Sequence, residues 1–438
     1  MAFFLKRMVK SRMALLSAAL LAGSFWFAGC AVEKSAVVAP REEPIATAKA
    51  EKGITGESLK CITCHEERGV AHGWVADWEG SAHARKGIGC EACHVRLALE
   101  PAEREAVAVG YLGTDGGNCD DKRVYRKVIA GNCGRCHIKQ YNEFMKSRHS
   151  IGWQGMTACA DRMELSREIR SEKCGQCHNI QFKCDSCHTR HSFSTLEAKT
   201  PEACRTCHTG SDHPHFETYI SSKHGSVYTA SQAGILKDFQ SVQSLRSPVC
   251  VTCHMPQGGH DISFGLACGP VGSEMSYINR DGVRVDEKEL SGRRNAMKFV
   301  CNACHSSNFS DTALSAADAL HKNAEIAVRE ARGVMAGLEK EGLIFPPTKG
   351  LTDVPIPGHA IILGNAELTT DKSRIERIFY KLVAGAAIAW KGAYHTNPNY
   401  AHLTGWAELQ GCMSDIREEA RKLREDAELR RKMEIRLR

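Results

Sequence analysis

The residues with the most obvious chemical potential form eight copies of the motif Cys-x-x-Cys-His. Two thiols about one helical turn apart can add to the two vinyl groups of a haem, and the adjacent histidine then lies under the iron. From this chain's own frequencies of Cys and His, chance supplies only about 0.05 such motifs. The predicted attachment cysteines and proximal histidines are Cys61, Cys64 and His65; Cys90, Cys93 and His94; Cys133, Cys136 and His137; Cys174, Cys177 and His178; Cys184, Cys187 and His188; Cys204, Cys207 and His208; Cys250, Cys253 and His254; Cys301, Cys304 and His305.

Zinc is the alternative ligand for paired cysteines. Structural zinc sites need further Cys or His partners at regular spacing, and a histidine directly after each second cysteine is not their pattern. The motifs lie within residues 61–305, about one for every 31 residues, which is too little chain for a separate side-chain core around each macrocycle. We therefore predict eight covalently bound haem c groups. They are expected to stack as much of the core of a mainly α protein, among short helices and loops.

Composition and charge exclude other classes of protein. The chain has 438 residues, of which 42% are hydrophobic and 25% charged, and this balance indicates a globular protein. Its formal net charge is +7, but residues 1–29 carry four basic and no acidic residues, so removing them leaves +3. Sixteen propionates on eight haems would add negative charge. The basic balance therefore does not predict nucleic-acid binding.

The first thirty residues are typical of an export signal. A basic start is followed by the apolar stretch 13–28, which is too short for a comfortable membrane span. The sequence Phe27-Ala28-Gly29-Cys30 resembles a bacterial lipobox, after whose cleavage Cys30 becomes a lipidated N-terminus; ordinary cleavage nearby is the alternative. We predict a signal peptide over 1–29, a flexible tether over 30–55 and a periplasmic protein anchored to the membrane by lipid.

Twelve histidines remain outside the motifs. An electron-transfer haem usually takes a second axial histidine, whereas a catalytic haem leaves that position open. His191 follows His188 by three residues and cannot reach the opposite face of the same haem, so as a ligand it would serve a neighbouring haem. His321 and His359 lie outside the motif segment and are expected at the surface. The twelve are His72, His83, His149, His191, His213, His215, His224, His260, His321, His359, His395 and His402.

The order of these motifs resembles the octahaem hydroxylamine oxidoreductases over most of residues 58–435. The matching segments are 174–178, 184–191, 201–208, Asp212-His213, 222–225, 250–260, 301–309 and 395–398. The resemblance implies that the fourth haem, held by Cys174, Cys177 and His178, is catalytic and that Asp212 and His213 line its open face. A histidine beside a carboxylate is a usual proton relay. The alternative is that His213 or His215 is simply another axial ligand.

The resemblance also implies a distal histidine for each of the other seven haems. The family places one of these ligands between the second and third motifs, where this chain has no spare histidine, and His72 is the substitute we name. The predicted distal ligands are His83, His149, His191, His224, His260, His395 and His72.

Oxidising members of the family carry a tyrosine, four residues before the Trp of a Gly-Trp pair, that cross-links to the catalytic haem of a neighbouring subunit. Four residues before Trp406 this chain has His402, and a slip of one residue gives Ala401 or Leu403. Tyr394 and Tyr400 are out of register. The resemblance therefore implies an enzyme that reduces nitrite or hydroxylamine to ammonia. No Cys-x-x-Cys-Lys occurs, which argues against nitrite reductases with a Lys-ligated haem.

No further Cys-x-x-Cys-His motif follows His305. Residues 311–342, 371–396 and 409–438 have helical patterns, the first followed by Gly342 and Pro346-Pro347. We expect an octahaem domain over 56–310 and a C-terminal helical domain over 311–438, and the resemblance adds a homotrimer. Cys119, Cys159, Cys268 and Cys412 are unassigned, with one or two disulfides as the default in an oxidising compartment.

Two rival functions remain open from the sequence. One is oxidation of hydroxylamine or hydrazine on the same scaffold, and the other is a non-enzymatic electron conduit in which every haem iron has two axial ligands. The expected partners are a small nitrogen oxide and a redox donor, either a cytochrome or a quinol-linked protein.

Overall fold

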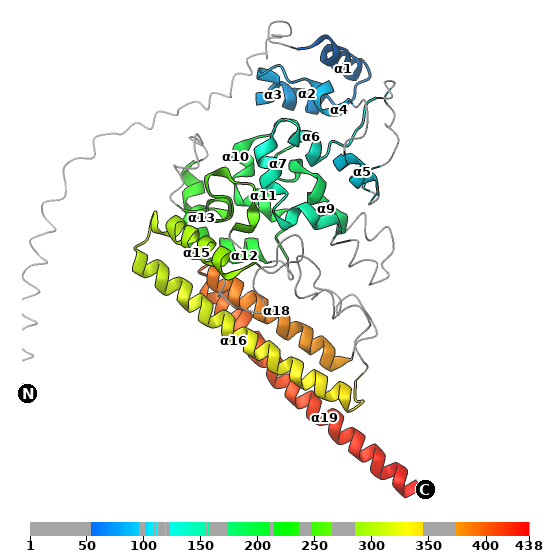
Figure 1. The fold of residues 1–438 in the computed structure, drawn as a ribbon, viewed down its shortest axis with the longest axis vertical. Helices are drawn as coiled ribbons and strands as arrows, with labels where there is room; N and C mark the ends of the chain where they lie inside the picture. Colours follow the sequence, from blue (N-terminus) through cyan, green and yellow to red (C-terminus); the bar gives the residue numbers. More distant parts are fainter. Residues whose placement is uncertain are drawn as a thin grey trace, which may run out of the picture. The chain divides into compact units, whose positions relative to one another are not determined.

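The computed structural model is helical throughout the part of the chain that it describes (Figure 1). It describes residues 54–95, 101–108, 111–112, 119, 123–154, 156, 174–210, 214–235, 247–264, 285–344 and 373–437. Within these ranges the extended pairing is limited to an isolated bridge between Val95 and Val124. The mainly α prediction is confirmed. The signal peptide and most of the tether, including Cys30, lie outside the described residues.

The motif-bearing segment consists of many short helices. Helices this short are marginal on their own and depend on what packs around them. The elements are α1 (Gly56–Glu67), α2 (His72–Glu79), α3 (Ala82–Arg85), α4 (Cys90–His94), α5 (Pro101–Ala108), α6 (Ala130–Gly134), α7 (Ile138–Phe144), η1 (Arg148–Ile151), α9 (Gly175–His178), η3 (Asn179–Phe182), η4 (Cys184–Ser186), α10 (Thr195–Ala198), α11 (Pro201–Arg205), α12 (His215–Ile220), α13 (Lys223–Ile235), α14 (Cys250–His254) and η6 (Pro256–Gly258).

Polar contacts hold the first two motifs together. Thr55 is the N-cap of α1, and its hydroxyl accepts from the Ser58 N–H at 3.1 Å. The Glu91 carboxylate accepts from the Thr55 hydroxyl at 2.6 Å and from the Ser58 hydroxyl. Ser58 Oγ in turn accepts from the Cys90 N–H at 3.0 Å. A Cβ at Gly89 would lie 1.9 Å from Ser58 Oγ, so this position requires glycine.

Long helices follow the last motif. They are α15 (Glu287–Asn302), which carries Cys301, then α16 (Ser307–Lys340), α18 (Arg374–Tyr394), the π-helical η8 (Asn399–Ala407) and α19 (Glu408–Leu437). The Ser306 hydroxyl caps α16 by accepting from the Phe309 N–H, and Gly342 has a positive φ of 68° just past its end. The predicted long C-terminal helices are confirmed. Helix α16 starts before the predicted boundary at 310/311, and the domain boundaries stay predictions.

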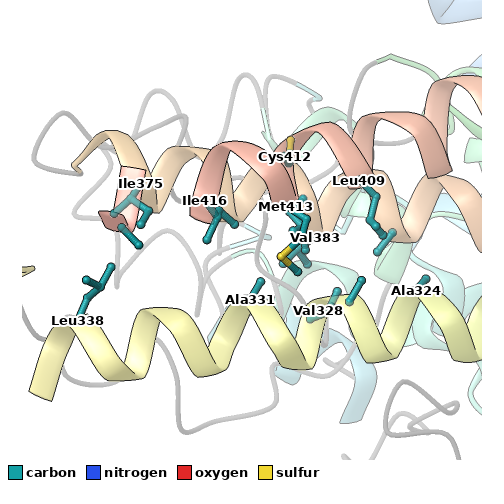
Figure 2. Packing of buried hydrophobic residues seen from close by; sticks show 14 residues of the cluster. Ala324, Val328, Ala331, Leu338, Ile375, Val383, Leu409, Cys412, Met413 and Ile416 are labelled. Atoms are coloured by element: carbon teal, nitrogen blue, oxygen red, sulfur yellow. The ribbon is translucent and has the colours of Figure 1, made fainter. Parts of the chain in front are cut away.

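A conventional hydrophobic core joins α16, α18 and α19. Leu338, Leu382, Leu409 and Ile416 have exposed fractions of 0%. Figure 2 shows Leu338 and other α16 side chains pointing toward Ile416 and its neighbours on α19. Within the described part of the chain, no helix combines the length and the apolarity that a membrane crossing requires.

One expectation is corrected here, and the expected disulfides are tested for two of the four unassigned cysteines. His321 is not at the surface: its exposed fraction is 2%, and its ring stacks on Trp390 at 4.8 Å because α16 and α18 pack along their lengths. Cys412 is a free thiol buried in the bundle core, and Cys119 is also free, so no disulfide joins cysteines within the described ranges. Cys159, Cys268 and His359 lie outside these ranges.

The bundle core makes a direct prediction about stability. Leu382→Ala should destabilise the bundle by about 2–5 kcal/mol, because it removes a fully buried side chain and leaves a cavity. The measurement is the denaturant midpoint of the helical circular dichroism signal. Leu429, which is 58% exposed on α19, is the control, and Leu429→Ala should change stability by less than about 0.5 kcal/mol. Equal effects of the two substitutions would contradict the packing.

Candidate haem-binding and catalytic site

Local helical geometry brings each motif's thiols and imidazole to one side. The carbonyl of the first cysteine accepts from the N–H of the motif histidine, at 2.8 Å for His137, 2.9 Å for His208 and 3.0 Å for His305. This is the i to i+4 bond of a single helical turn. Each such turn presents two thiols and one imidazole together, as covalent attachment of a haem requires.

The motifs surround one continuous cavity of about 3890 Å³. Cysteines of seven of the eight motifs line it, together with apolar side chains such as Trp74, Trp78 and Tyr111. Pockets for single small ligands measure about 300–1,000 Å³, so this space is about four times the upper value. A cavity of this size, lined by thiols and imidazoles, fits several large apolar cofactors lying close to one another.

Six motif histidines each face a second histidine. An imidazole nitrogen binds a metal ion at about 2.0–2.1 Å, so two imidazoles on opposite sides of one ion have ring centroids about 6 Å apart. The measured separations match this geometry, and the chain's residues therefore fit haem iron held between two histidines. The pairs are His83–His137 at 6.0 Å, His149–His208 at 6.0 Å, His224–His305 at 6.1 Å, His94–His191 at 6.2 Å, His254–His395 at 6.2 Å and His188–His260 at 6.3 Å.

Backbone carbonyls orient several of these imidazoles. In four histidines, Nδ1 lies 2.8–3.0 Å from a backbone carbonyl oxygen. The contacts are His94 with Tyr125, His260 with Gly258, His395 with Lys391 and His178 with Gly152. A carbonyl only accepts, so Nδ1 carries the proton and Nε2 is left with the lone pair that binds a metal.

Burial keeps two of the facing histidines, His149 and His254, in the neutral form that binds a metal. It lowers the pKa of His149 to about 4, and burial with the neighbouring His395 lowers the pKa of His254 to about 4. A lowered pKa means that the ring loses its proton at lower pH, so both rings are neutral at pH 7.

His191 faces the second motif and not its own. Its φ is 70°, in the left-handed region where a side chain is uncommon. The ring lies 6.2 Å from His94 at an interplanar angle of 23°, and Trp74 stacks on it at 5.7 Å. The short spacing from His188 required such a neighbour, but the sequence did not say which one.

The first motif differs from these six. Among the described residues, no second imidazole lies against His65, and no ring contact joins it to His72, which begins α2. The predicted role of His72 as a distal ligand gains no support from this arrangement.

The fourth motif lies on α9, beside η3, which in turn packs against η1. His178 contacts the Gly152 carbonyl, and the Gln181 side chain accepts from the Gln154 N–H at 3.0 Å. The Cys177 thiol lies within hydrogen-bond reach of Cys207 of the sixth motif. Cys133 and Cys184 make the same kind of contact, as do Cys204 and Cys250. Neighbouring attachment sites are thus in direct contact.

Asp212 and His213 lie outside the described residues, but both flanks of their loop are anchored. The Glu217 carboxylate accepts from the Thr209 hydroxyl and from the Gly210 N–H at 3.4 Å. The His208 carbonyl accepts from the Phe216 N–H at 3.0 Å. His215 lies edge-on to His208 at 5.1 Å, which is too close for two imidazoles on opposite sides of one metal ion.

The sequence reasoning missed a link between the C-terminal region and α12, the helix that follows this loop. Asn397 is 2% exposed, and its amide donates to the Thr218 carbonyl at 2.6 Å and to Ser221 Oγ at 2.9 Å. Asn397 lies in the 395–398 segment that carried the family resemblance, and this was the available signal. Nearby, burial and the Glu217 carboxylate raise the pKa of Tyr400.

The two candidate tyrosines have different surroundings. The Tyr394 hydroxyl donates to Asp318 at 2.6 Å within the helical bundle. His402, at the position of the cross-linking tyrosine, is exposed on η8. The absence of the cross-link stays a prediction.

The fold and these sites define a multihaem c-type cytochrome. Residues 86–350, more than half of the chain, match the family described as "Seven times multi-haem cytochrome CxxCH", and residues 29–95 match "Cytochrome c554 and c-prime". The chain belongs to this multihaem cytochrome family, in its branch similar to hydroxylamine oxidoreductase (HAO).

A curated relative and two solved structures extend the comparison. The chain is 28% identical over 446 residues to a "Probable nitrite reductase-hydroxylamine oxidoreductase fusion protein" of Kuenenia stuttgartiensis, covering 83% of this chain and 51% of the relative. The chain thus spans about half the length of that protein. A Kuenenia stuttgartiensis "reducing HAO-like protein complex" superposes with a TM-score of 0.63 at 25% identity, covering 86% of this chain and 87% of that one. A "Hypothetical multiheme protein" shares the fold alone, with a TM-score of 0.62, 16% identity and coverage of 86% and 97%.

The angles between facing imidazoles predict different magnetic signatures. The planes meet at 15° for His188–His260 but at 79° for His83–His137. In low-spin ferric haem, near-perpendicular imidazoles give a highly anisotropic electron paramagnetic resonance signal, and near-parallel ones give an ordinary rhombic signal. His83→Ala should therefore remove a highly anisotropic signal, whereas His260→Ala should remove a rhombic one. Survival of every low-spin signal in His83→Ala would rule out this pair.

Proposed function

We propose that this protein carries eight haem c groups and reduces nitrite, hydroxylamine or both to ammonia at the fourth haem. The observation that carries the proposal is the set of six facing histidine pairs, at 6.0–6.3 Å, on an HAO-like scaffold. Haem c supplies one-electron transfer and, where an axial position is open, a binding place for a small nitrogen oxide.

The chain's own residues are assigned two tasks, holding the haems that carry electrons and delivering protons to the substrate. The six facing histidine pairs would hold haem iron in the six-coordinate form suited to electron transfer, and these six haems together with that of the first motif would supply the fourth. Contacts between cysteines of different motifs, including Cys177 with Cys207, support close spacing of the attached groups. His213 with Asp212 is assigned the transfer of protons to substrate, because breaking N–O bonds consumes protons along with electrons.

Two observations favour the reductive direction. His402 replaces the cross-linking tyrosine at its register, so we expect an unmodified haem that returns electrons readily to bound substrate. The hydroxyl of Tyr394, one of the two alternative tyrosines, donates a hydrogen bond to Asp318. The word "reducing" in the description of the similar Kuenenia complex is said of that protein and agrees with this direction.

An electron conduit without catalysis is the second candidate, because the same six histidine pairs would serve it. It requires a second axial ligand on the fourth haem as well. Activity toward nitrite separates the two functions.

The proposal is tested by turnover with a reduced viologen as electron donor and nitrite or hydroxylamine as substrate. We expect reductive turnover to exceed hydroxylamine oxidation under matched conditions. His213→Ala should lower reductive turnover by about 10²–10⁴, the usual contribution of a positioned acid or base. Intact mass should show eight haems in both proteins, and the visible spectrum of the other seven should be unchanged.

A matched pair of aspartates provides the control. Asp212→Asn should lower turnover, whereas Asp426→Asn, an exposed position on α19, should leave it unchanged. Conversion of a low-spin haem to high-spin character in His213→Ala would instead identify His213 as an axial ligand and favour the conduit. Absence of any nitrite or hydroxylamine reduction by wild-type protein, together with only low-spin haem, would favour the conduit.

We also propose that the protein is a periplasmic lipoprotein attached through Cys30, acting as a homotrimer with a cytochrome or quinol-linked electron donor. Cys30→Ser should release the protein from membranes into the soluble periplasmic fraction, because the lipidated residue is lost. The N-terminal peptide of wild-type protein should carry an acyl mass. Wild-type protein that is already soluble and unacylated would contradict the anchor.

A further inference from the structure

A polar cluster joins α15, α16 and α18 next to His395, the histidine that faces His254 of the seventh motif. Asp318 of α16 receives two hydrogen bonds from Arg294 of α15, at 3.1 Å to Oδ1 and 2.7 Å to Oδ2. The Tyr394 hydroxyl at the end of α18 also donates to Oδ1, at 2.6 Å. Both members of the ion pair are largely buried, with side-chain exposures of 17% and 25%. A two-point Arg–carboxylate contact of this kind fixes orientation as well as distance.

The cluster lies against a histidine predicted to bind iron. Tyr394 is the last residue of α18, and His395 follows it directly as the C-cap. His395 Nδ1 contacts the Lys391 carbonyl at 2.8 Å, so the last turn of α18 orients the imidazole. Its ring lies 6.2 Å from His254 at an interplanar angle of 26°. Any rotation of that last turn changes this angle.

Of the other two helices, α15 carries a haem-attachment cysteine and α16 belongs to the helical bundle. Arg294 precedes Cys301 by seven residues on α15, two helical turns along the same face. Asp318 lies one turn before His321, whose ring stacks on Trp390 of α18 at 4.8 Å and an angle of 10°. The end of α18 is therefore held both by the aromatic stack and by the Tyr394 hydrogen bond.

We propose that Arg294, Asp318 and Tyr394 are positioning residues that fix the plane of the His395 imidazole relative to that of His254. This inference rests on the proposed function in one respect: it requires His395 to be the distal ligand of the seventh haem. Breaking the Tyr394–Asp318 hydrogen bond frees the last turn of α18 to rotate and alters the imidazole angle. The magnetic signature and midpoint potential of that haem then change, while the haem remains attached through Cys250 and Cys253.

The experiment uses the full-length holoprotein and three variants. His395→Ala first identifies the low-spin signal of the seventh haem as the one that it removes. Tyr394→Phe keeps the ring and loses only the hydroxyl, and it should shift the g-values and the midpoint potential of that one signal, with the haem count by mass unchanged. Asp318→Asn should shift the same signal. Should Asp318→Asn fail to fold, Tyr394→Phe alone decides.

The control breaks a similar contact at the other end of the bundle. Arg424 of α19 contacts Glu341 through two bonds of 2.7 Å, and Glu341→Gln should leave all haem signals in place. An unchanged seventh-haem signal in Tyr394→Phe overturns the positioning role and leaves the proposed function intact. Retention of every low-spin signal in His395→Ala would instead overturn the ligand assignment, and the inference with it.

Discussion

The separation of about 6 Å between facing imidazoles is the constraint on which the motif-bearing segment depends. It is the separation that a metal ion bound by both imidazoles would give, and the facing nitrogens would hold one macrocycle between them. Each pair joins residues distant in the sequence, such as His254 of α14 and His395 after α18. Helices as short as α4 and α9 gain little from their own hydrogen bonds. Covalent attachment at one end and a histidine from elsewhere in the chain at the other supply the cross-connections that a side-chain core would otherwise give.

The C-terminal region is stabilised by a different principle. Helices α16, α18 and α19 bury aliphatic side chains at helical spacing, with Leu382 and Ile416 wholly inaccessible. The two regions meet through polar side chains: Asn397 bonds to α12, and Asp318 connects α15 with the end of α18. Because His395 is the C-cap of α18, the bundle is in a position to orient the ring that faces His254. The bundle therefore affects the orientation of the His395 ring as well as the stability of the C-terminal region.

The state of the imidazoles follows from the same surroundings. Burial lowers the pKa of His83, His188 and His224, each with a further contribution from a facing histidine. Neutral rings with Nδ1 directed at a carbonyl are ready for metal binding as soon as the chain folds. The loop that contains Asp212 and His213 is anchored by residues of a different kind, Glu217 with Thr209, close to the sixth motif. Under the proposed function, the residues that would bind the haems and those that would deliver protons are therefore anchored by different contacts.

The sequence by itself determined the haem chemistry and the helical class. Thiol and imidazole spacing within a motif is a property of one helical turn, and the apolar spacing of residues 371–396 is a property of one helix, so both can be read locally. It also restricted His191 to a neighbouring motif, since three residues cannot span a macrocycle. The partners of each motif histidine were decided only by the tertiary structure, because a metal joins ligands regardless of their distance along the chain. The same reason explains His321, whose burial depends on how α16 packs against α18, and His72, which lacks a ring contact with His65. The Arg294–Asp318–Tyr394 cluster could not be read from the sequence either, since its three residues meet only where three helices cross.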